Sequence, residues 1–176
     1  MSILKIARLG HPILRTKTRP LDVSEISEPT FQRLIDDMSD TMHEYEGIGL
    51  AAPQVHQNMR FFIAGVDNPE MNFQPVIMIN PKVTIVGSKT NEDWEGCLSI
   101  PDIRGRVQRA TDITINALDR HGRAISMDAS GFSARVIQHE TDHLDGVLFF
   151  DRMTSFETLT FLDEYSRYWN QEEKKA

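Results

Sequence analysis

The sequence predicts an α+β fold in which antiparallel β-sheets pack around a central helix, with a second helix towards the N-terminus and a third at the C-terminus. Three observations support this prediction. Apolar residues recur at helical spacing over 29–46 and again from Gly131 onwards. Between these segments, short apolar runs alternate with turn residues, as they do in β-hairpins. The length of 176 residues is typical of one domain, so we expect residues 1–176 to fold as a single unit.

The composition is that of a globular protein, with 40% hydrophobic and 26% charged residues. The formal net charge is −7 and the Lys and Arg residues are scattered, which argues against nucleic acid as a direct partner. We find no apolar run long enough for a signal peptide or a membrane span, so a cytoplasmic protein without a membrane partner is expected. The single cysteine, Cys97, excludes an internal disulfide and fits a reducing compartment.

The N-terminal third divides into an arm, a helix and a loop. Residues 1–28 contain Pro12 and Pro20 among polar breaks, which predicts an irregular arm with at most a short turn. Residues 29–46 are predicted to form an amphipathic helix that ends at Gly47. The small residues of 47–54 would let a backbone approach closely, and the Gln54 amide could polarise a carbonyl. Taken alone, this loop is better explained as a helix stop followed by a tight loop.

The middle of the chain predicts six strands and the end predicts a helix. The strands are expected at 60–66, 76–81, 82–86, 105–109, 112–119 and 123–129. The last two would be joined by a turn at His121 and Gly122. A final helix after Thr154 is indicated by the spacing of Leu159, Leu162, Tyr165 and Trp169.

The central helix carries a His-Glu-x-x-His pattern within 138–146. On a helix, His139 and His143 lie on one face, so both imidazoles can bind one cation, and Glu140 can reach a water on that cation. Phe132, Val136 and the two histidines form one stripe, which we expect to face the core. The alternative is that two core or surface histidines fell at this spacing by chance. The adjacent glutamate favours a metal site, and the central helix is therefore predicted to bind a metal.

A catalytic metal site usually has three protein ligands, so a third must come from elsewhere. The extended zinc-protease pattern would place histidine at position 149, where the sequence has Phe149. A second protease layout uses a downstream glutamate, for which Glu157 and Glu164 are candidates. The remaining candidate is Cys97, in a Gly-Cys-Leu turn, whose thiolate a metal would stabilise.

Three segments together resemble the signature motifs of bacterial-type peptide deformylases. They are Gly-Ile-Gly-Leu-Ala-Ala-Pro-Gln at 47–54, Glu-Gly-Cys-Leu-Ser at 95–99 and Gln-His-Glu-Thr-Asp-His-Leu at 138–144. They occur in that family's order, and the resemblance extends from the first helix to the third motif. It implies that Cys97, His139 and His143 bind the metal and that Glu140 is the general acid/base.

The same resemblance implies the rest of the chemistry. Gln54 and the backbone N–H of Leu98 would stabilise the oxyanion. The metal would be Fe²⁺ in the cell, with Zn²⁺ or Ni²⁺ able to occupy the same ligands. The substrate would be a nascent polypeptide with N-formylmethionine at its amino terminus, hydrolysed to formate and a free amine by attack of metal-bound water. The ribosome near its exit tunnel is then a candidate partner.

The expected substrate-binding residues are neighbours of the motifs. Ile48, Gly49, Phe132 and Val136 are predicted to line the methionine pocket, and the peptide backbone would pair with edges near Gly49 and Ile100. Arg135 lies beside this pocket on the predicted helix, with an effect that the motifs do not define. Two rival functions remain open: a zinc endopeptidase with Glu157 or Glu164 as third ligand, and a peptide-binding module with a structural metal.

Overall fold

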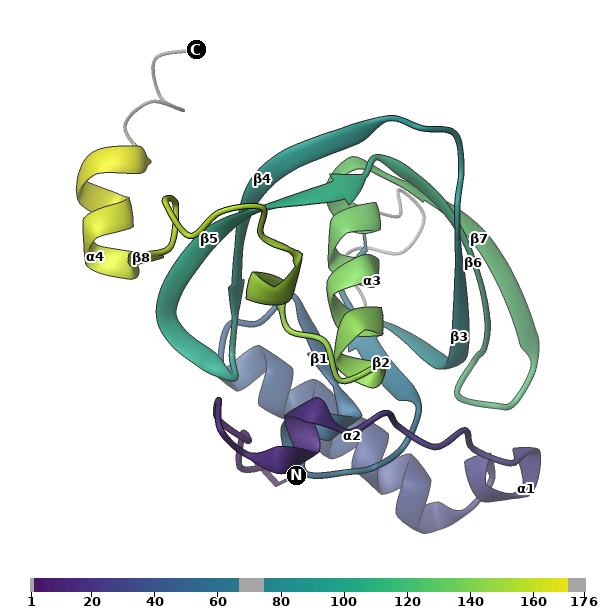
Figure 1. Cartoon of the computed structure of the whole chain (residues 1–176). Coiled ribbons are helices and arrows are strands. Elements are labelled where there is room, and N and C mark those ends of the chain that lie inside the picture. The colour runs from purple at the N-terminus through teal and green to yellow at the C-terminus, as the bar shows by residue number, and fades with distance from the viewer. Residues whose placement is uncertain (1, 67–74, 171–176) are drawn as a thin grey trace.

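The structure is a computed structural model that describes residues 2–66 and 75–170. Two antiparallel sheets surround one helix, α3 (Gly131–Leu144), which contacts strands of both sheets (Figure 1). The first sheet has the order β1-β2-β3-β6-β7 and the second has the order β4-β5-β8. The strands of the first sheet are β1 (Gly49–Ala51), β2 (Phe61–Ala64), β3 (Val76–Ile85), β6 (Asp112–Leu118) and β7 (Ala124–Ser130). Those of the second are β4 (Thr90–Cys97), β5 (Ile100–Ala110) and β8 (Thr160–Phe161). The predicted α+β architecture is confirmed.

The N-terminal arm is more ordered than predicted. It contains a 3-10 turn, Pro12–Arg15, and a short helix, α1 (Val23–Ile26), instead of at most one turn. The missed signal is a capping box, in which the Glu25 carboxylate accepts a hydrogen bond of 2.9 Å from the backbone N–H of Asp22. The long helix α2 (Pro29–Glu44) follows as predicted, but it ends two residues before the expected end. Its buried stripe packs on β1 and β2.

The strand β3 is continuous where two strands were predicted. The sequence break at Asn80 and Pro81 is a bulge, because the register with β6 shifts between Ile79 and Lys82. Asn80 has a φ of 51°, which asparagine tolerates better than most residues. Its side chain accepts a hydrogen bond from the Leu21 N–H and donates one to the Leu21 carbonyl. The bulge therefore fastens the N-terminal arm to the first sheet.

The strands β4 and β5 form a hairpin that is longer than the predicted strand 105–109. Cys97 pairs with Ile100, so the hairpin turns through Leu98 and Ser99. The register shifts between Glu95 and Cys97, which leaves Gly96 in a bulge just before the turn. The turn thus lies at the end of two long strands that hold it in place.

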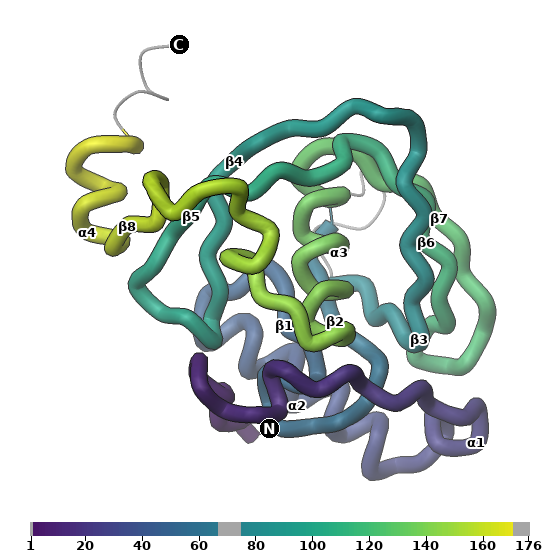
Figure 2. Tube along the Cα trace, viewed as in Figure 1, coloured from purple at the N-terminus to yellow at the C-terminus, as the bar shows by residue number. Residues whose placement is uncertain are grey.

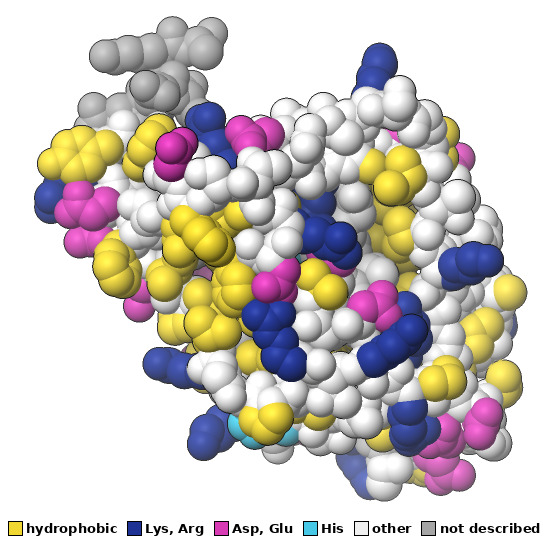
Figure 3. Space-filling view, in the orientation of Figure 1, with side chains coloured by type: hydrophobic (Ala, Val, Ile, Leu, Met, Phe, Trp, Pro, Cys, Tyr) yellow, Lys and Arg dark blue, Asp and Glu magenta, His cyan; other side chains and the backbone are white. Residues whose placement is uncertain are grey.

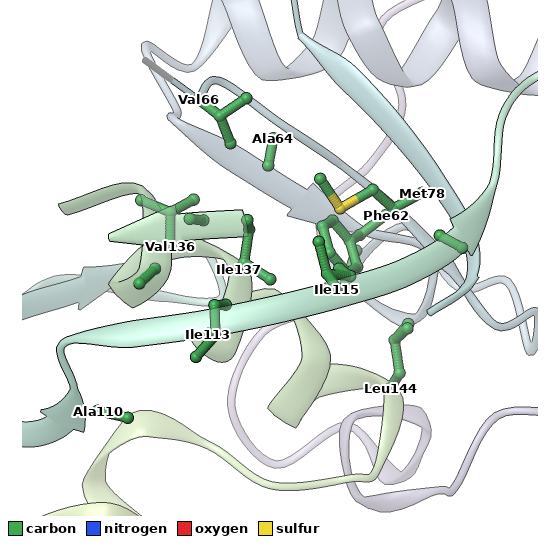
Figure 4. Packing of buried hydrophobic residues seen from close by; sticks show 14 residues of the cluster. Phe62, Ala64, Val66, Met78, Ala110, Ile113, Ile115, Val136, Ile137 and Leu144 are labelled. Carbon is green, nitrogen blue, oxygen red and sulfur yellow. The ribbon is translucent and has the colours of Figure 1, made fainter. Parts of the chain in front are cut away.

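The helix α3 buries an apolar face against the first sheet (Figure 4). Members of this cluster from β2, β3, β6 and α3 include Phe62, Met78, Ile115, Ile137 and Leu144. One expectation about this helix was wrong: Phe132 does not face the core and is 52% exposed. It lies in the first turn of α3, one turn before the buried Val136, and borders the cleft described below.

The C-terminal segment begins as a strand rather than a helix. β8 pairs antiparallel with β5, joining Ile103 to Phe161 and Arg104 to Thr160. The chain then enters α4 (Leu162–Glu164) and a π-helical turn at Tyr165–Trp169. The predicted final helix therefore exists but starts later than expected, and Figure 2 shows it beside β5. Within 2–66 and 75–170, every helix is too short or too polar to cross a membrane.

Candidate active site and metal centre

The structure brings Cys97, His139 and His143 together. The two histidines lie one turn apart on α3, with ring centroids 4.9 Å apart. The β4–β5 turn places the Cys97 Sγ 3.2 Å from the Nε2 of His143. The ligand atoms of all three residues lie within 4.8 Å of one another, and all three side chains are buried. Among the described residues, this is the one group of three or more histidine, cysteine or carboxylate side chains close enough to hold a metal ion.

The donor set fits a divalent metal of the zinc or iron type, since one thiolate and two imidazoles are typical ligands of these ions. The electrostatics of Cys97 agree. Burial opposes ionisation, but the neighbouring imidazoles of His143 and His139 lower the pKa of the thiol well below its usual value. Two buried polar atoms, Nδ1 of His143 and Oε2 of Glu140, have no hydrogen-bond partner within the described chain. Such orphaned atoms are uncommon except where a ligand or water completes a site.

Glu95 supports the site and was missed by the sequence reasoning. Its Oε2 accepts a hydrogen bond of 2.9 Å from Nδ1 of His139, which leaves Nε2 of that imidazole for a metal. Its Oε1 accepts hydrogen bonds from Arg109 and Arg135, at 2.9 and 2.8 Å. Burial works against the charged form, yet these partners lower the pKa of Glu95 to about 2. The available signal was its position two residues before Cys97, which places both side chains on one face of β4.

Arg135 belongs to this support and also borders the cleft beside Phe132 and Val136. Besides Glu95, its guanidinium donates to the backbone carbonyls of Val107 and Asn91, at 2.8 and 2.7 Å. It therefore ties α3 to both strands of the β4–β5 hairpin. Arg109 also pairs with Asp142 on the next turn of the helix. The relative position of the cysteine and the histidines thus depends on a buried network of opposite charges.

Glu140 lies against the strand β1. It is 4% exposed, and burial raises the pKa of its carboxyl to about 7. A Cβ atom at Gly49 would lie 2.6 Å from Cδ and 2.7 Å from Cγ of Glu140, so a side chain at position 49 would displace the carboxylate. Glycine at position 49 thus provides the space that the Glu140 carboxylate occupies.

Gln54 is oriented toward the same centre. It lies in the 3-10 turn Ala52–Val55, where its Oε1 accepts a hydrogen bond of 2.8 Å from the Ala51 N–H. This bond directs Nε2 toward the site, where it lies 3.4 Å from the Cys97 Sγ and 3.3 Å from the Ser99 Oγ. Leu98 lies in the β4–β5 turn, and its side chain packs against the buried apolar cluster that α2 forms with β1 and β2.

A cleft of about 600 Å³ opens onto these residues. Four of the predicted substrate-binding residues border it: Ile48, Gly49, Phe132 and Val136. Ile100 does not, because its side chain is buried and its backbone pairs with Cys97. Pro101 and Asp102 border the cleft instead.

The glutamates of the rival protease layout lie elsewhere. Glu164 pairs with Arg167 on the surface, at 3.1 Å. Glu157 is exposed and does not belong to the metal-binding group. The structure therefore does not favour a ligand set of two histidines and a downstream glutamate.

Comparisons with known proteins agree with this geometry. The family model described as polypeptide deformylase matches residues 3–158. The chain is 44% identical over 158 residues to peptide deformylase 2 of Nostoc sp., covering 87% of each chain. It is 45% identical over 155 residues to peptide deformylase 2 of Xanthomonas campestris, covering 88% of this chain and 89% of the relative. A Met-Ala-Ser-bound class I type b peptide deformylase from Acinetobacter baumannii superposes with a TM-score of 0.81 at 38% identity, covering 87% of this chain and 100% of that one.

Proposed function

Because the chain belongs to the polypeptide deformylase family, and is therefore a hydrolase acting on formyl-methionyl peptides, we propose a mechanism built on the residues of this cleft. The reaction cleaves the formamide C–N bond of N-formylmethionine with water, giving formate and a free amino terminus. The observation that carries the proposal is the approach of one thiol and two imidazoles to within 4.8 Å, beside the buried carboxylate of Glu140.

Cys97, His139 and His143 are proposed to hold the metal, with Fe²⁺ as the ion in the cell and Zn²⁺ or Ni²⁺ as substitutes. When bound, such an ion lowers the pKa of a water and polarises a carbonyl oxygen. The protein fixes the three donors in place. Glu95 does this for His139, and the β4–β5 turn does it for Cys97.

Glu140 is proposed to move the proton. Its carboxylate takes a proton from the attacking water and delivers it to the departing amine nitrogen, so that the amine leaves neutral. Burial raises the pKa of the Glu140 carboxyl above its ordinary value, which supports its role as a proton acceptor. The burial that raises this pKa also keeps bulk water from competing for the proton.

Gln54 and the backbone N–H of Leu98 are proposed to donate hydrogen bonds to the formyl oxygen as it gains negative charge. The hydrogen bond from the Ala51 N–H fixes the Gln54 amide before substrate arrives, so little reorganisation is needed during the reaction. One such donor is typically worth about 100-fold or more in rate.

The substrate peptide is proposed to add to the outer edge of β1. This strand is the terminal strand of its sheet and pairs with β2 on one side. A backbone running past Gly49 can therefore form strand-like hydrogen bonds. The methionine side chain would then enter the space between Ile48, Phe132 and Val136, against the flank of His139. We further propose the cytoplasm as the location, with the ribosome near its exit tunnel as a partner.

Anaerobic purification with metal analysis, paired with formate release from a formyl-Met peptide, tests the proposal. Cys97→Ser should lose both metal and activity, because it removes the thiolate donor. Glu140→Gln should keep the metal and lose activity by orders of magnitude, because it removes the proton carrier. Retention of metal and activity by Cys97→Ser would instead support the endopeptidase ligand set. Full activity of Glu140→Gln would exclude Glu140 as the proton carrier.

A further inference from the structure

The C-terminal segment 160–169 lies beyond the part of the chain that the family model matches, and it forms part of the catalytic cleft. The strand β8 extends the second sheet along the outer edge of β5. Directly after it, Leu162 borders the same cleft as Cys97 and Glu140. The segment therefore contributes Leu162 to the lining of the cleft.

An aromatic clamp, consisting of Trp94, Tyr165 and Trp169, holds this segment in place. The ring of Trp94 lies 4.8 Å from that of Tyr165 and 5.5 Å from that of Trp169, measured between centroids. The Arg106 guanidinium lies 5.3 Å from the centre of the Trp94 ring. Trp94 itself borders the cleft, so the clamp connects the cleft wall directly to the C-terminal segment.

The side chains of the segment divide between two faces. Phe161 is 64% exposed and Phe156 is 66% exposed, whereas Leu162 is half-buried at the cleft. Figure 3 shows hydrophobic side chains gathered on the left of this face of the molecule, over β5, β8 and the segment leading to α4. Leu162, which directly follows the exposed Phe161, is thus the member of this segment that lies at the cleft.

The spacing along β4 indicates what this part of the lining would contact. Trp94 precedes Cys97 by three residues, which corresponds to at most about 10 Å because the bulge at Gly96 shortens the strand. An extended peptide advances at the same rate of roughly 3.3 Å per residue. A peptide whose formyl group lies at Cys97 and whose chain runs along this part of the lining therefore brings about its third residue to Trp94 and Leu162.

We propose that Leu162 and Trp94 form a subsite for an apolar side chain at about the third residue of the substrate peptide. This inference rests on the proposed function, because it assumes that the formyl group is held at Cys97. Leu162 is a positioning residue for the substrate and touches no reacting atom. Its loss should weaken binding of longer peptides without changing the chemical step.

Steady-state kinetics on formyl-Met-Ala and formyl-Met-Ala-Leu provide the test. Leu162→Ala should raise the KM for the tripeptide about three- to tenfold, leave its kcat unchanged, and leave both constants unchanged for the dipeptide. Leu162→Met keeps the apolar volume and should restore the tripeptide KM. The matched control is Leu159→Ala, which makes the same chemical change three residues earlier, outside the cleft lining.

Tryptophan fluorescence gives a second readout that needs no turnover. The two tryptophans of the chain, Trp94 and Trp169, both belong to the aromatic clamp. Titration with the product Met-Ala-Leu should change the emission, with a Kd that Leu162→Ala raises three- to tenfold relative to Leu159→Ala.

Equal dissociation constants for these two variants would overturn the subsite. Sedimentation gives the mass of the assembly formed by each protein. If Leu162→Ala forms a smaller assembly than the wild-type protein, the surface is a contact between copies of the chain and the subsite is overturned. Absence of formate release from either substrate by the wild-type protein would count against the proposed function, while the product titration would still test the subsite.

Discussion

Glu95→Gln removes one negative charge from the network that holds His139. The two oxygens of Glu95 accept four hydrogen bonds, two from Arg109, one from Arg135 and one from His139. A glutamine has one oxygen and one NH₂ group in their place, and either orientation of the amide points its N–H groups at two of these donors. If the NH₂ group faces His139, the imidazole must turn its proton to Nε2, the atom that should bind the metal.

The size of the effect follows from these contacts. Two of the four hydrogen bonds are lost, and bonds to charged groups contribute about 1.5–3 kcal/mol each, so the free energy of unfolding should fall by about 3–6 kcal/mol. Metal affinity should fall about 10–100-fold, as is typical when the partner of a ligand histidine is removed. The measurements are urea unfolding of the metal-free protein and a competition titration with a zinc chelator of known affinity.

Asp142→Asn is the matched control for this change. Asp142 pairs with Arg109 and Arg152 in the same network, but it makes no hydrogen bond to His139 that would set its tautomer. We expect it to lower the free energy of unfolding by a similar amount while zinc affinity stays near that of the wild-type protein. If both variants bind zinc equally well, the argument that Glu95 orients His139 is wrong.

Four further results are expected. Gly49→Ala should retain metal but lose about 100-fold or more in kcat, because the new methyl group displaces Glu140; wild-type kcat would contradict this reading of the close approach. Gln54→Ala should lower kcat about 100-fold with metal content unchanged, and a change in KM alone would argue against an oxyanion donor. The pKa of Glu25 is lowered to about 2, first by its hydrogen bond from Arg19, so its stabilising effect is present above pH 4.5 and is lost as the pH falls through about 2. The difference in urea midpoint between wild type and Glu25→Gln should therefore shrink over that range. The iron form should lose activity in air faster than the zinc or nickel forms, because an iron-bound thiolate is open to oxidation, and equal decay of all three would contradict this.

The sequence predicted the fold class, and for different physical reasons it indicated side chains that the structure brings together. Helical periodicity located α2 and α3 because a single buried face repeats along each helix. The three motifs located Cys97, Gln54 and Glu140 because each carries an unusual combination of residues in a fixed order. Periodicity could not show that Phe132 lies outside the core, since the position of the sheets relative to the first helical turn is a tertiary property.

Other features depend on contacts between distant segments. The role of Glu95 requires the pairing of β4 with β5 and the packing of α3 on both, and none of these is encoded locally. The strand β8 pairs with the edge of β5, and its own two residues, although both types favour strands, are too few to predict one. The break at Asn80 was detectable, but only the pairing with β6 shows that it is a bulge within one strand.

The proposed ligands come from parts of the chain that are 46 positions apart, counted from Cys97 to His143. An ion bound to both ends would join them only while the chain is folded, because the ion is released on unfolding, so it would stabilise the folded state by mass action. At a free ion concentration of 100 times Kd, the linkage would add about 2.7 kcal/mol to the free energy of unfolding. The melting temperature of this protein should then rise with the free concentration of the ion in the culture or buffer. A chelator should lower the melting temperature with the amino-acid sequence unchanged.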